Sequence, residues 1–412
     1  MKILTLSWEY PPRIVGGIAR VVYDLTQEMS QKGIDNYILT CGEEGLRKQE
    51  SRKNLNIYRV NPYNIEGYDF IQWVYHLNMA MVEKAVQLYM EGIRFDIIHV
   101  HDWITAFCGR TLKGIFKIPL VSTIHATEFG RNSGLHNDMQ KYISNIEWWL
   151  TYESNRVIVN SRFMENQLTG FFQLQKDKIS IVHNGVRVED FASNDPSQQF
   201  RGKYAAENEK IIFHIGRIVQ EKGLQVLIDA IPLLLKDFQA FKVVIAGKGP
   251  FLDTIKKHAA ELGIEDKIYF TGFIDDATRN MLFRASDAAV FPSLYEPFGI
   301  VALEGMAARI PVVVSDTGGL RETIEQEKDG LKFSSGSSKD LAAKLLYVLK
   351  NPEQSKKMAE NGYKKVKNSY SWSDISDRVI CIYNEVLNNT NNPLVINLQK
   401  GWLNEGHHYG RG

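Results

Sequence analysis

The sequence has few cysteines, almost no net charge and no long apolar run. Its 412 residues include three cysteines, far apart at Cys41, Cys108 and Cys381, which excludes a disulfide framework or a zinc motif and favours a reducing compartment. A net charge of +1 gives no electrostatic reason to bind nucleic acid. No apolar stretch approaches a membrane span, and the one in residues 1–9 is too short for a signal peptide. We therefore expect a cytoplasmic protein without nucleic-acid partners or stable membrane insertion, with its oligomeric state left open.

Several catalytic signatures are also missing from the sequence. No acidic cluster, Asp-x-Asp arrangement or His/Cys set predicts an obligatory metal. No nucleophile elbow or Cys/His signature indicates acyl chemistry. No Gly-x-Gly-x-x-Gly fingerprint opens the first helix, which disfavours a nicotinamide cofactor.

What the sequence does contain is a regular alternation of short apolar strands and helices. Such alternation predicts doubly wound parallel sheets, and the chain is long enough for about two domains. We expect residues 1–190 and 200–370 to form these domains, residues 371–390 to form a closing helix and residues 391–412 to form a tail. The linker is expected at residues 194–199, within the polar and irregular segment 184–209, and the polar segment 42–54 separates two of the predicted strands. Strands are predicted at residues 3–7, 37–40, 55–60, 96–102, 119–124, 156–160 and 178–182, and then at 210–215, 241–245, 267–270, 288–291 and 311–314.

Polar residues follow the strands of the first predicted sheet. In such sheets ligands bind beyond the carboxyl ends of the strands, so these groups are expected to meet at one edge. A lone histidine such as His125 is more often structural than catalytic, and that alternative stays open. The amphipathic helix predicted near residues 67–92 is a core helix or the wall of an acceptor site, because Lys84 is its only basic residue. The polar strand ends are His101–Asp102, His125, Asn160 and His183.

A second set of strand ends predicts an anion pocket. Residues 216–223 place Arg217 and Lys222 around the start of a helix, where two cations and free amides suit a diphosphate. A solvated charge pair is the alternative. The glycine pairs Gly16–Gly17 and Gly318–Gly319 also follow strands, and together these features favour the pocket.

The segment 295–306 breaks the local pattern most clearly. It turns after an apolar strand and starts a helix near Phe298, and Glu304 falls inside the apolar stripe of that helix. Glu296 lies eight positions earlier, beside the helix N-terminus. Pattern violations of this kind indicate a functional site.

These residues resemble the retaining glycosyltransferases of the two-domain GT-B type, the group that includes bacterial and archaeal glycogen synthases. The signature is Glu–Pro–Phe–Gly–Ile–Val–Ala–Leu–Glu at residues 296–304, supported by residues 216–223, by Gly16–Gly17 and by residues 183–186. The motifs at residues 101–103, 125–131 and 147–150 are similar to those of prokaryotic glycogen synthases and related maltose-1-phosphate-forming enzymes. The resemblance implies an α/β GT-B fold: two Rossmann-like parallel-sheet domains facing a cleft.

The resemblance also implies a role for each matching residue. Catalytic roles fall to His125, Arg217, Lys222 and Glu296, with the two cations on the diphosphate, His125 on the 6-hydroxyl of the sugar and Glu296 facing the sugar. Glu304 would bind the ribose hydroxyls. Further donor contacts are implied for Gly16, Gly17, Phe273, Ile274, Phe298, Gly299, Thr317, Gly318 and Gly319, and acceptor contacts for His101, Asp102 and Asn160.

The implied activity is a retaining, nucleotide-sugar-dependent hexosyltransferase with no obligatory cofactor or metal. We expect transfer of glucose from ADP-glucose or UDP-glucose to an α-1,4-glucan. The alternatives are a small phosphorylated acceptor, which would yield maltose 1-phosphate or a disaccharide phosphate, or a lipid. A non-catalytic glucan- or nucleotide-binding scaffold and a nucleotide-sugar epimerase are the remaining competitors.

Overall fold

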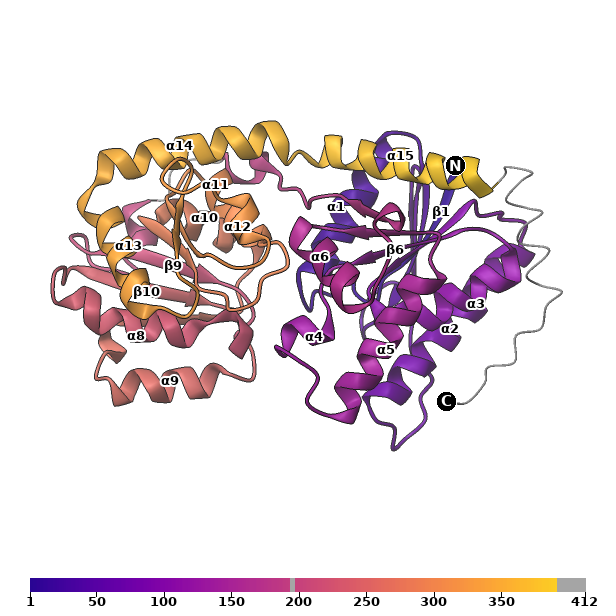
Figure 1. Ribbon diagram of the computed structural model, residues 1–412, viewed down its shortest axis with the longest axis horizontal. Coiled ribbons are helices and arrows are strands. Elements are labelled where there is room, and N and C mark those ends of the chain that lie inside the picture. The colour runs from indigo at the N-terminus through magenta and orange to yellow at the C-terminus, as the bar shows by residue number, and fades with distance from the viewer. Residues whose placement is uncertain (193–196, 391–412) are drawn as a thin grey trace.

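The computed structural model describes residues 1–192 and 197–390. These residues form two α/β halves, each built on its own sheet with helices on both faces (Figure 1); the strands are parallel except for one edge strand of the first sheet. The predicted fold class is therefore confirmed. The expected tail at 391–412 and half of the expected linker at 194–199, residues 194–196, lie outside the described residues.

The first sheet has eight strands in the order β3-β4-β2-β1-β5-β6-β7-β8. Its central strands β1, β5 and β6 are almost wholly buried and apolar, as expected for a parallel sheet covered on both faces. The strands are β1 (Lys2–Leu6), β2 (Asp35–Cys41), β3 (Gln49–Arg52), β4 (Leu55–Val60), β5 (Ile97–His101), β6 (Leu120–Ile124), β7 (Arg156–Val159) and β8 (Ile179–Ile181). The helices are α1 (Gly17–Gln31), α2 (Phe70–Met90), α3 (Ala106–Phe116), α4 (Glu128–Arg131), α5 (Asp138–Glu153) and α6 (Arg162–Phe171).

One strand of this sheet was not predicted. β3 lies within the polar segment 42–54, where the sequence predicted no strand, and pairs antiparallel with β4 at the sheet edge. Its residues are polar and mostly exposed, so they show no buried alternation. Only pairing with β4 makes the segment a strand.

The second sheet has six parallel strands in the order β11-β10-β9-β12-β13-β14. The strands are β9 (Lys210–Ile215), β10 (Phe241–Ala246), β11 (Ile268–Gly272), β12 (Ala288–Phe291), β13 (Val312–Ser315) and β14 (Leu331–Phe333). The helices are α7 (Gln198–Arg201), α8 (Leu224–Leu235), α9 (Leu252–Glu261), α10 (Asp276–Ala285), α11 (Ile300–Ala307), α12 (Leu320–Thr323), α13 (Ser338–Lys350) and α14 (Pro352–Ser369). The helix expected to start near Phe298 is α11, which starts at Ile300 because Gly299 adopts φ 92° and cannot continue a helix backwards.

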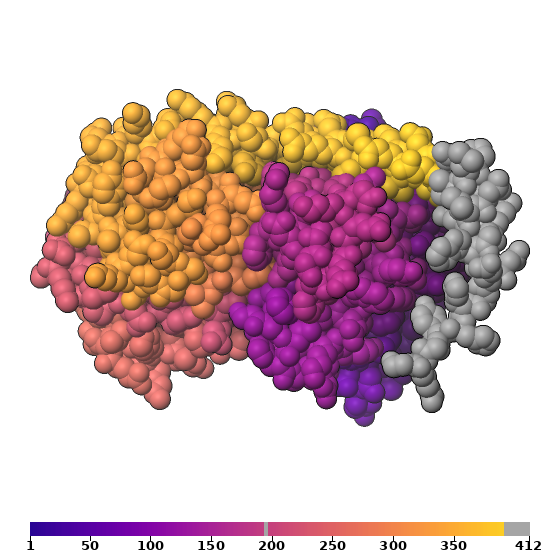
Figure 2. Space-filling view, in the orientation of Figure 1, coloured from indigo at the N-terminus to yellow at the C-terminus, as the bar shows by residue number. Residues whose placement is uncertain are grey.

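The last helix, α15 (Trp372–Thr390), returns to the first half of the molecule. Figure 1 shows α14 over the second sheet and α15 crossing to the first, and Figure 2 shows the two halves in contact beneath them. Trp372, Ile375, Val379 and Tyr383 are buried against α1 and the first sheet. Burying one such side chain stabilises the folded state by roughly 1.5–3 kcal/mol, so α15 holds the second half firmly to the first.

The order of strands determines where a ligand can bind. In the first sheet successive strands are added on one side of β1 up to β4 and on its other side from β5 onward, so the strand order reverses between β1 and β5. In the second sheet the order reverses in the same way between β9 and β12. Crevices at the carboxyl ends of strands open at such switch points. The loops that follow these four strands face one another between the two halves.

Candidate active site

A cleft of about 510 Å³ lies between the two switch points. Its walls come from the loops after β1, β5, β6 and β7 on one side and from those after β9 and β12 on the other. A cavity of about 630 Å³ lies elsewhere, beside Lys210 and Asp287 at the amino ends of β9 and β12, and contains none of the predicted residues. The cleft brings together most of the predicted site: Gly16, Gly17, Asp102, His125, Asn160, Arg217, Lys222, Glu296, Phe298 and Gly299.

The second half supplies the charged wall of this cleft, which carries Arg217, Lys222 and Glu296. Lys222 Nζ donates to Glu296 Oε2 at 2.7 Å, and Ser293 Oγ donates to the same oxygen at 3.1 Å. The loop of Lys222 is fixed to the turn before Glu296, because the amides of Leu294 and Tyr295 donate to the carbonyl of Glu221. Arg217 is exposed and makes no hydrogen bond or ion pair with any described residue. One cation is thus fixed and the other is free to bind an anion.

The first half holds His125 by its backbone. The His125 amide donates to Asp102 Oδ1 at 2.7 Å, and Asn160 Nδ2 donates to the His125 carbonyl at 3.3 Å. Asp102 itself adopts φ 57° and ψ 175°, a conformation that is essentially restricted to glycine and that is retained mainly at functional sites. The predicted acceptor-side residues Asp102 and Asn160 therefore orient His125 as well as lining the cleft.

His101 lies behind His125 and does not line the cleft. Its Nδ1 is 3.0 Å from His125 Nε2, and the two rings stack at 5.3 Å. Burial lowers the pKa of both imidazoles, so both are neutral at physiological pH and share one proton in their hydrogen bond. Nδ1 of His125 has no partner among the described side chains and backbone groups, which leaves it available to a ligand.

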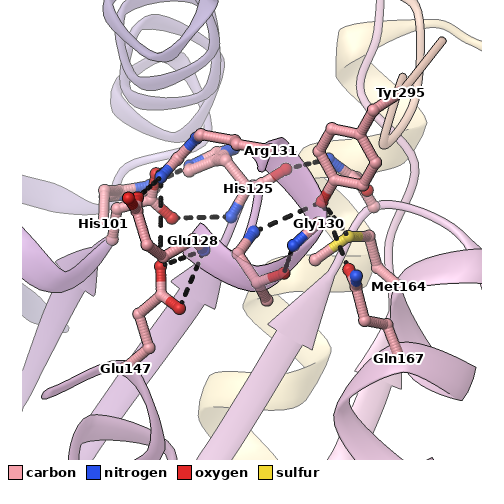
Figure 3. A network of polar contacts seen from close by, with 12 residues as sticks. His101, His125, Glu128, Gly130, Arg131, Glu147, Met164, Gln167 and Tyr295 are labelled. Carbon is pink, nitrogen blue, oxygen red and sulfur yellow. Dashed lines mark hydrogen bonds and ion pairs between the residues drawn. The ribbon is translucent and has the colours of Figure 1, made fainter. Parts of the chain in front are cut away.

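Arg131 and Glu147, which belong to the motifs at residues 125–131 and 147–150 but had no role assigned from the sequence, complete this side of the cleft (Figure 3). Arg131 of α4 lies 3.7 Å from Asp102, 3.5 Å from Glu128 and 3.9 Å from Glu147. The Glu128 amide donates to both oxygens of Glu147. Burial raises the pKa of Glu147 to about 8 despite the opposing effect of Arg131. Arg131 is thus surrounded by three carboxyl groups, of which Glu147 keeps its proton near neutral pH.

Tyr295 joins the two halves at the edge of the cleft. Its ring reaches from the turn before Glu296 into a space between α4 and α6 (Figure 3). The Tyr295 hydroxyl accepts from the Thr127 amide at 3.3 Å and donates to Gln167 Oε1 at 3.2 Å. A Cβ at Gly130 would lie 2.3 Å from Tyr295 Cζ, so only glycine fits there. The residue next to Glu296 is therefore in direct contact with the first half of the molecule.

Glu304 lies in a neighbouring cleft, not in the cleft of Lys222. It is buried on α11 and its Oε1 accepts from Arg20 at 3.2 Å and from Arg279 at 3.1 Å. Its Oε2 is buried without a hydrogen-bond partner. Burial raises the pKa of Glu304 to about 7. The neighbouring cleft, about 540 Å³, shares Val21 and Ile300 with the first, so one elongated ligand could extend through both.

The glycines predicted to contact the donor do not all lie in the cleft. The amides of Val15 and Gly16 donate to Glu9 Oε2 at 2.6 and 2.7 Å. The Gly16 amide is therefore already hydrogen-bonded to a carboxylate of the chain itself. Gly318 and Gly319 lie outside the cleft, behind the turn that carries Glu296. A Cβ at Gly318 would lie 2.0 Å from the Glu296 carbonyl oxygen, so this glycine permits close packing of backbone on backbone.

The remaining predicted donor residues do not line either cleft. Thr317 Oγ1 donates to the carbonyl of Leu294, which supports the same turn from behind. Phe273 is 62% exposed in the loop between β11 and α10, and Ile274 follows it. Within residues 1–192 and 197–390, no three His, Cys, Asp or Glu side chains gather as metal ligands, and no helix is long and apolar enough to cross a membrane.

Sequence and structure comparisons agree with this arrangement. Residues 15–190 match the family described as Glycosyltransferase Family 4, and residues 196–365 match Glycosyl transferases group 1. An uncharacterized glycosyltransferase of Methanocaldococcus jannaschii is 36% identical over 387 residues, which cover 93% of this chain and 98% of the relative. Glycogen synthase of Mycobacterium tuberculosis is 30% identical over 397 residues, with 93% and 94% covered.

A solved structure shares the fold. Sucrose-phosphate synthase from Thermosynechococcus elongatus superimposes with a TM-score of 0.81 at 21% identity, and the match covers 93% of this chain and 98% of that one. Two full-length relatives at 30% identity or more, together with the two facing parallel-sheet halves, establish the family. The chain belongs to the GT-B glycosyltransferases of the family 4/5 type.

Proposed function

We propose that this glycosyltransferase moves glucose from ADP-glucose or UDP-glucose, with retention of configuration, to an α-1,4-glucan. The observation that carries the proposal is the cleft in which the Lys222–Glu296 pair and the unpaired Arg217 face the neutral His125. Cations on one wall suit a diphosphate leaving group. The glycogen synthase of M. tuberculosis, related over 93% of this chain, supports the choice of acceptor.

Each residue near the donor then has a distinct task. Arg217 and Lys222 bind the diphosphate, and the amides at the start of α11, near Phe298 and Gly299, bind sugar hydroxyls. His125 Nδ1 binds the 6-hydroxyl. Glu304 binds the ribose hydroxyls, for which its unpartnered Oε2 is suited.

The remaining donor residues act mainly through the backbone. Residues 273 and 274 contact the base, and residues 317–319 hold the turn against phosphate and sugar. The Gly16–Gly17 loop approaches phosphate through amides that Glu9 does not occupy. The domain limits that we propose are 1–190 and 200–370, with 371–390 returning to the first domain.

The proposed chemical step takes place on one face of the sugar. The bond between the anomeric carbon and the diphosphate oxygen breaks while the acceptor oxygen bonds to the same carbon. The acceptor proton passes to the departing phosphate, and nucleoside diphosphate and the elongated glucan are released. Glu296 is held by Lys222 and Ser293, which favours a sugar-binding role over that of a covalent nucleophile.

The proposal is tested by mixing the protein with each donor and maltotriose. Release of nucleoside diphosphate and a new α-1,4 linkage, identified by NMR, would support it. The Lys222→Ala variant should lose at least about 10²-fold in rate, because a cation on the leaving group acts mainly in the transition state. Lys339→Ala is the matched control, since Lys339 is an exposed, unpaired lysine on α13.

Three outcomes would contradict the proposal. No nucleoside diphosphate release with any acceptor would favour a scaffold, and donor conversion without acceptor would favour an epimerase. A fully active Lys222→Ala variant would overturn the diphosphate assignment.

A further inference from the structure

The wall of the cleft opposite the diphosphate residues carries an unusual exposed ring. Phe70, the first residue of α2, lines the cleft and is 50% exposed. One face of its ring stacks on Trp73, with centroids 5.9 Å apart and planes inclined by 10°. Trp103, which also lines the cleft, meets Phe70 edge-on at 6.1 Å. Phe70 is therefore an apolar platform that is supported from behind and open toward the cleft.

The start of α2 fixes this platform in place. Asp69 Oδ1 accepts from the Gln72 amide at 2.8 Å, while Gln72 Oε1 accepts from the Asp69 amide at 2.9 Å. This reciprocal capping box defines the first turn of the helix and hence the position of Phe70. A side chain so placed loses little further entropy when a ligand stacks on it.

The same wall is acidic. Glu9, Asp102 and Glu128 line it, and Arg131 is the single cation among its described lining residues. Arg131 lies within 4 Å of Asp102 and Glu128, so two carboxylates already compensate its charge. The two other cations lining the cleft, Arg217 and Lys222, belong to the opposite wall. An anionic acceptor on this wall would meet repulsion without a free positive partner.

We propose that an uncharged glucosyl unit of the acceptor stacks on Phe70 at this wall, and that phosphorylated or carboxylated acceptors are rejected there. This inference rests on the proposed glucosyltransferase function and selects the acceptor. Carboxylates accept hydrogen bonds from sugar hydroxyls, and the C–H face of a pyranose packs on an aromatic ring. A few polar groups around an apolar platform are typical of small-molecule sites.

The subsite is tested with the Phe70→Ala and Phe70→Trp variants. Phe70→Ala should raise the KM for maltotriose roughly tenfold, the loss of about one stacking contact, while the KM for the donor stays unchanged. Phe70→Trp should retain the wild-type value. Met79→Ala is the matched control, because Met79 is equally exposed on the same helix and lies outside the cleft. Melting temperatures of all variants should stay close to wild type.

Acceptor choice is tested by competition between maltotriose and glucose 1-phosphate. Wild type should transfer to maltotriose and not detectably to glucose 1-phosphate, and Glu128→Gln should increase the relative rate with the phosphate. Faster wild-type transfer to glucose 1-phosphate, or an unchanged acceptor KM in Phe70→Ala, would overturn the subsite alone. Absence of nucleoside diphosphate release with every acceptor would overturn the proposed function and the subsite together.

Discussion

The contact between Gly130 and Tyr295 allows a sharp test of how the two halves cooperate. Replacing Gly130 by Ala adds one methyl group, which would lie 2.3 Å from Tyr295 Cζ. Gly130 lies in α4 and has no positive φ, so Ala is compatible with its backbone. Ala is favoured over Gly in helices by roughly 1 kcal/mol, so the first half should not be destabilised. The perturbation therefore acts on the junction between the halves.

The size of the effect follows from the overlap. Ordinary carbon–carbon contacts are about 3.5–4.0 Å, so Tyr295 must retreat by more than about 1 Å. Tyr295 is adjacent to Glu296, and a misplacement of about 1 Å near a reacting centre can cost roughly 10²-fold in rate. We expect Gly130→Ala to reduce kcat/KM by between about tenfold and a hundredfold, with a loss of stability of no more than about 1–3 kcal/mol from displacement of the buried Tyr295 ring.

Steady-state assays of a double-mutant cycle measure this. Tyr295→Ala removes the clashing ring, so adding Gly130→Ala to it should have little further effect. Tyr295→Phe keeps Cζ, so the clash and the penalty of Gly130→Ala should persist in that background. Gly170→Ala is the control, because a Cβ at this glycine of α6 meets nothing within 4 Å. Wild-type activity of Gly130→Ala, or equal penalties in the Tyr295→Ala and wild-type backgrounds, would refute the coupling.

Two further predictions concern buried acidic residues of the first half, Glu147 and Asp102. The pKa of Glu147 is raised to about 8, so the folded state binds the proton more tightly and stability is lost as pH rises toward 8. Glu147→Gln should lack this loss, so the melting temperature of the variant should rise relative to that of wild type as the pH is raised from 5 to 9. A difference in melting temperature that does not change with pH would contradict the raised pKa of Glu147. Asp102 adopts φ 57°, a conformation that glycine tolerates better than alanine. The free energy of unfolding of Asp102→Gly, measured by denaturant titration, should therefore exceed that of Asp102→Ala by about 1–3 kcal/mol. An alanine variant as stable as the glycine variant would contradict backbone strain there.

Local patterns in the sequence were sufficient for the general architecture. The short apolar runs before His125 and Glu296 predicted buried parallel strands, and the polar residues at their ends predicted one binding edge. These inferences depend on periodicity over a few residues, which burial on both faces of a sheet enforces. The same reasoning missed β3, because an exposed polar edge strand carries no such period.

The placement of individual side chains needed the tertiary structure. The sequence contains Glu9, but only the fold shows that its carboxylate occupies the Gly16 amide. Glu304 was correctly singled out as a buried charge, yet its arginine partners come from α1 and α10, and its cleft is separate from that of Lys222.

The sequence by itself determined the two parallel sheets, the polar strand ends and the spacing from Glu296 to Glu304. The tertiary structure decided how the two halves meet: Tyr295 seated on Gly130, and Phe70 placed opposite Arg217 across one cleft. The physical reason is that strand and helix patterns express burial within a segment. Contacts between residues more than a hundred positions apart depend on how two finished sheets pack, which no local pattern encodes.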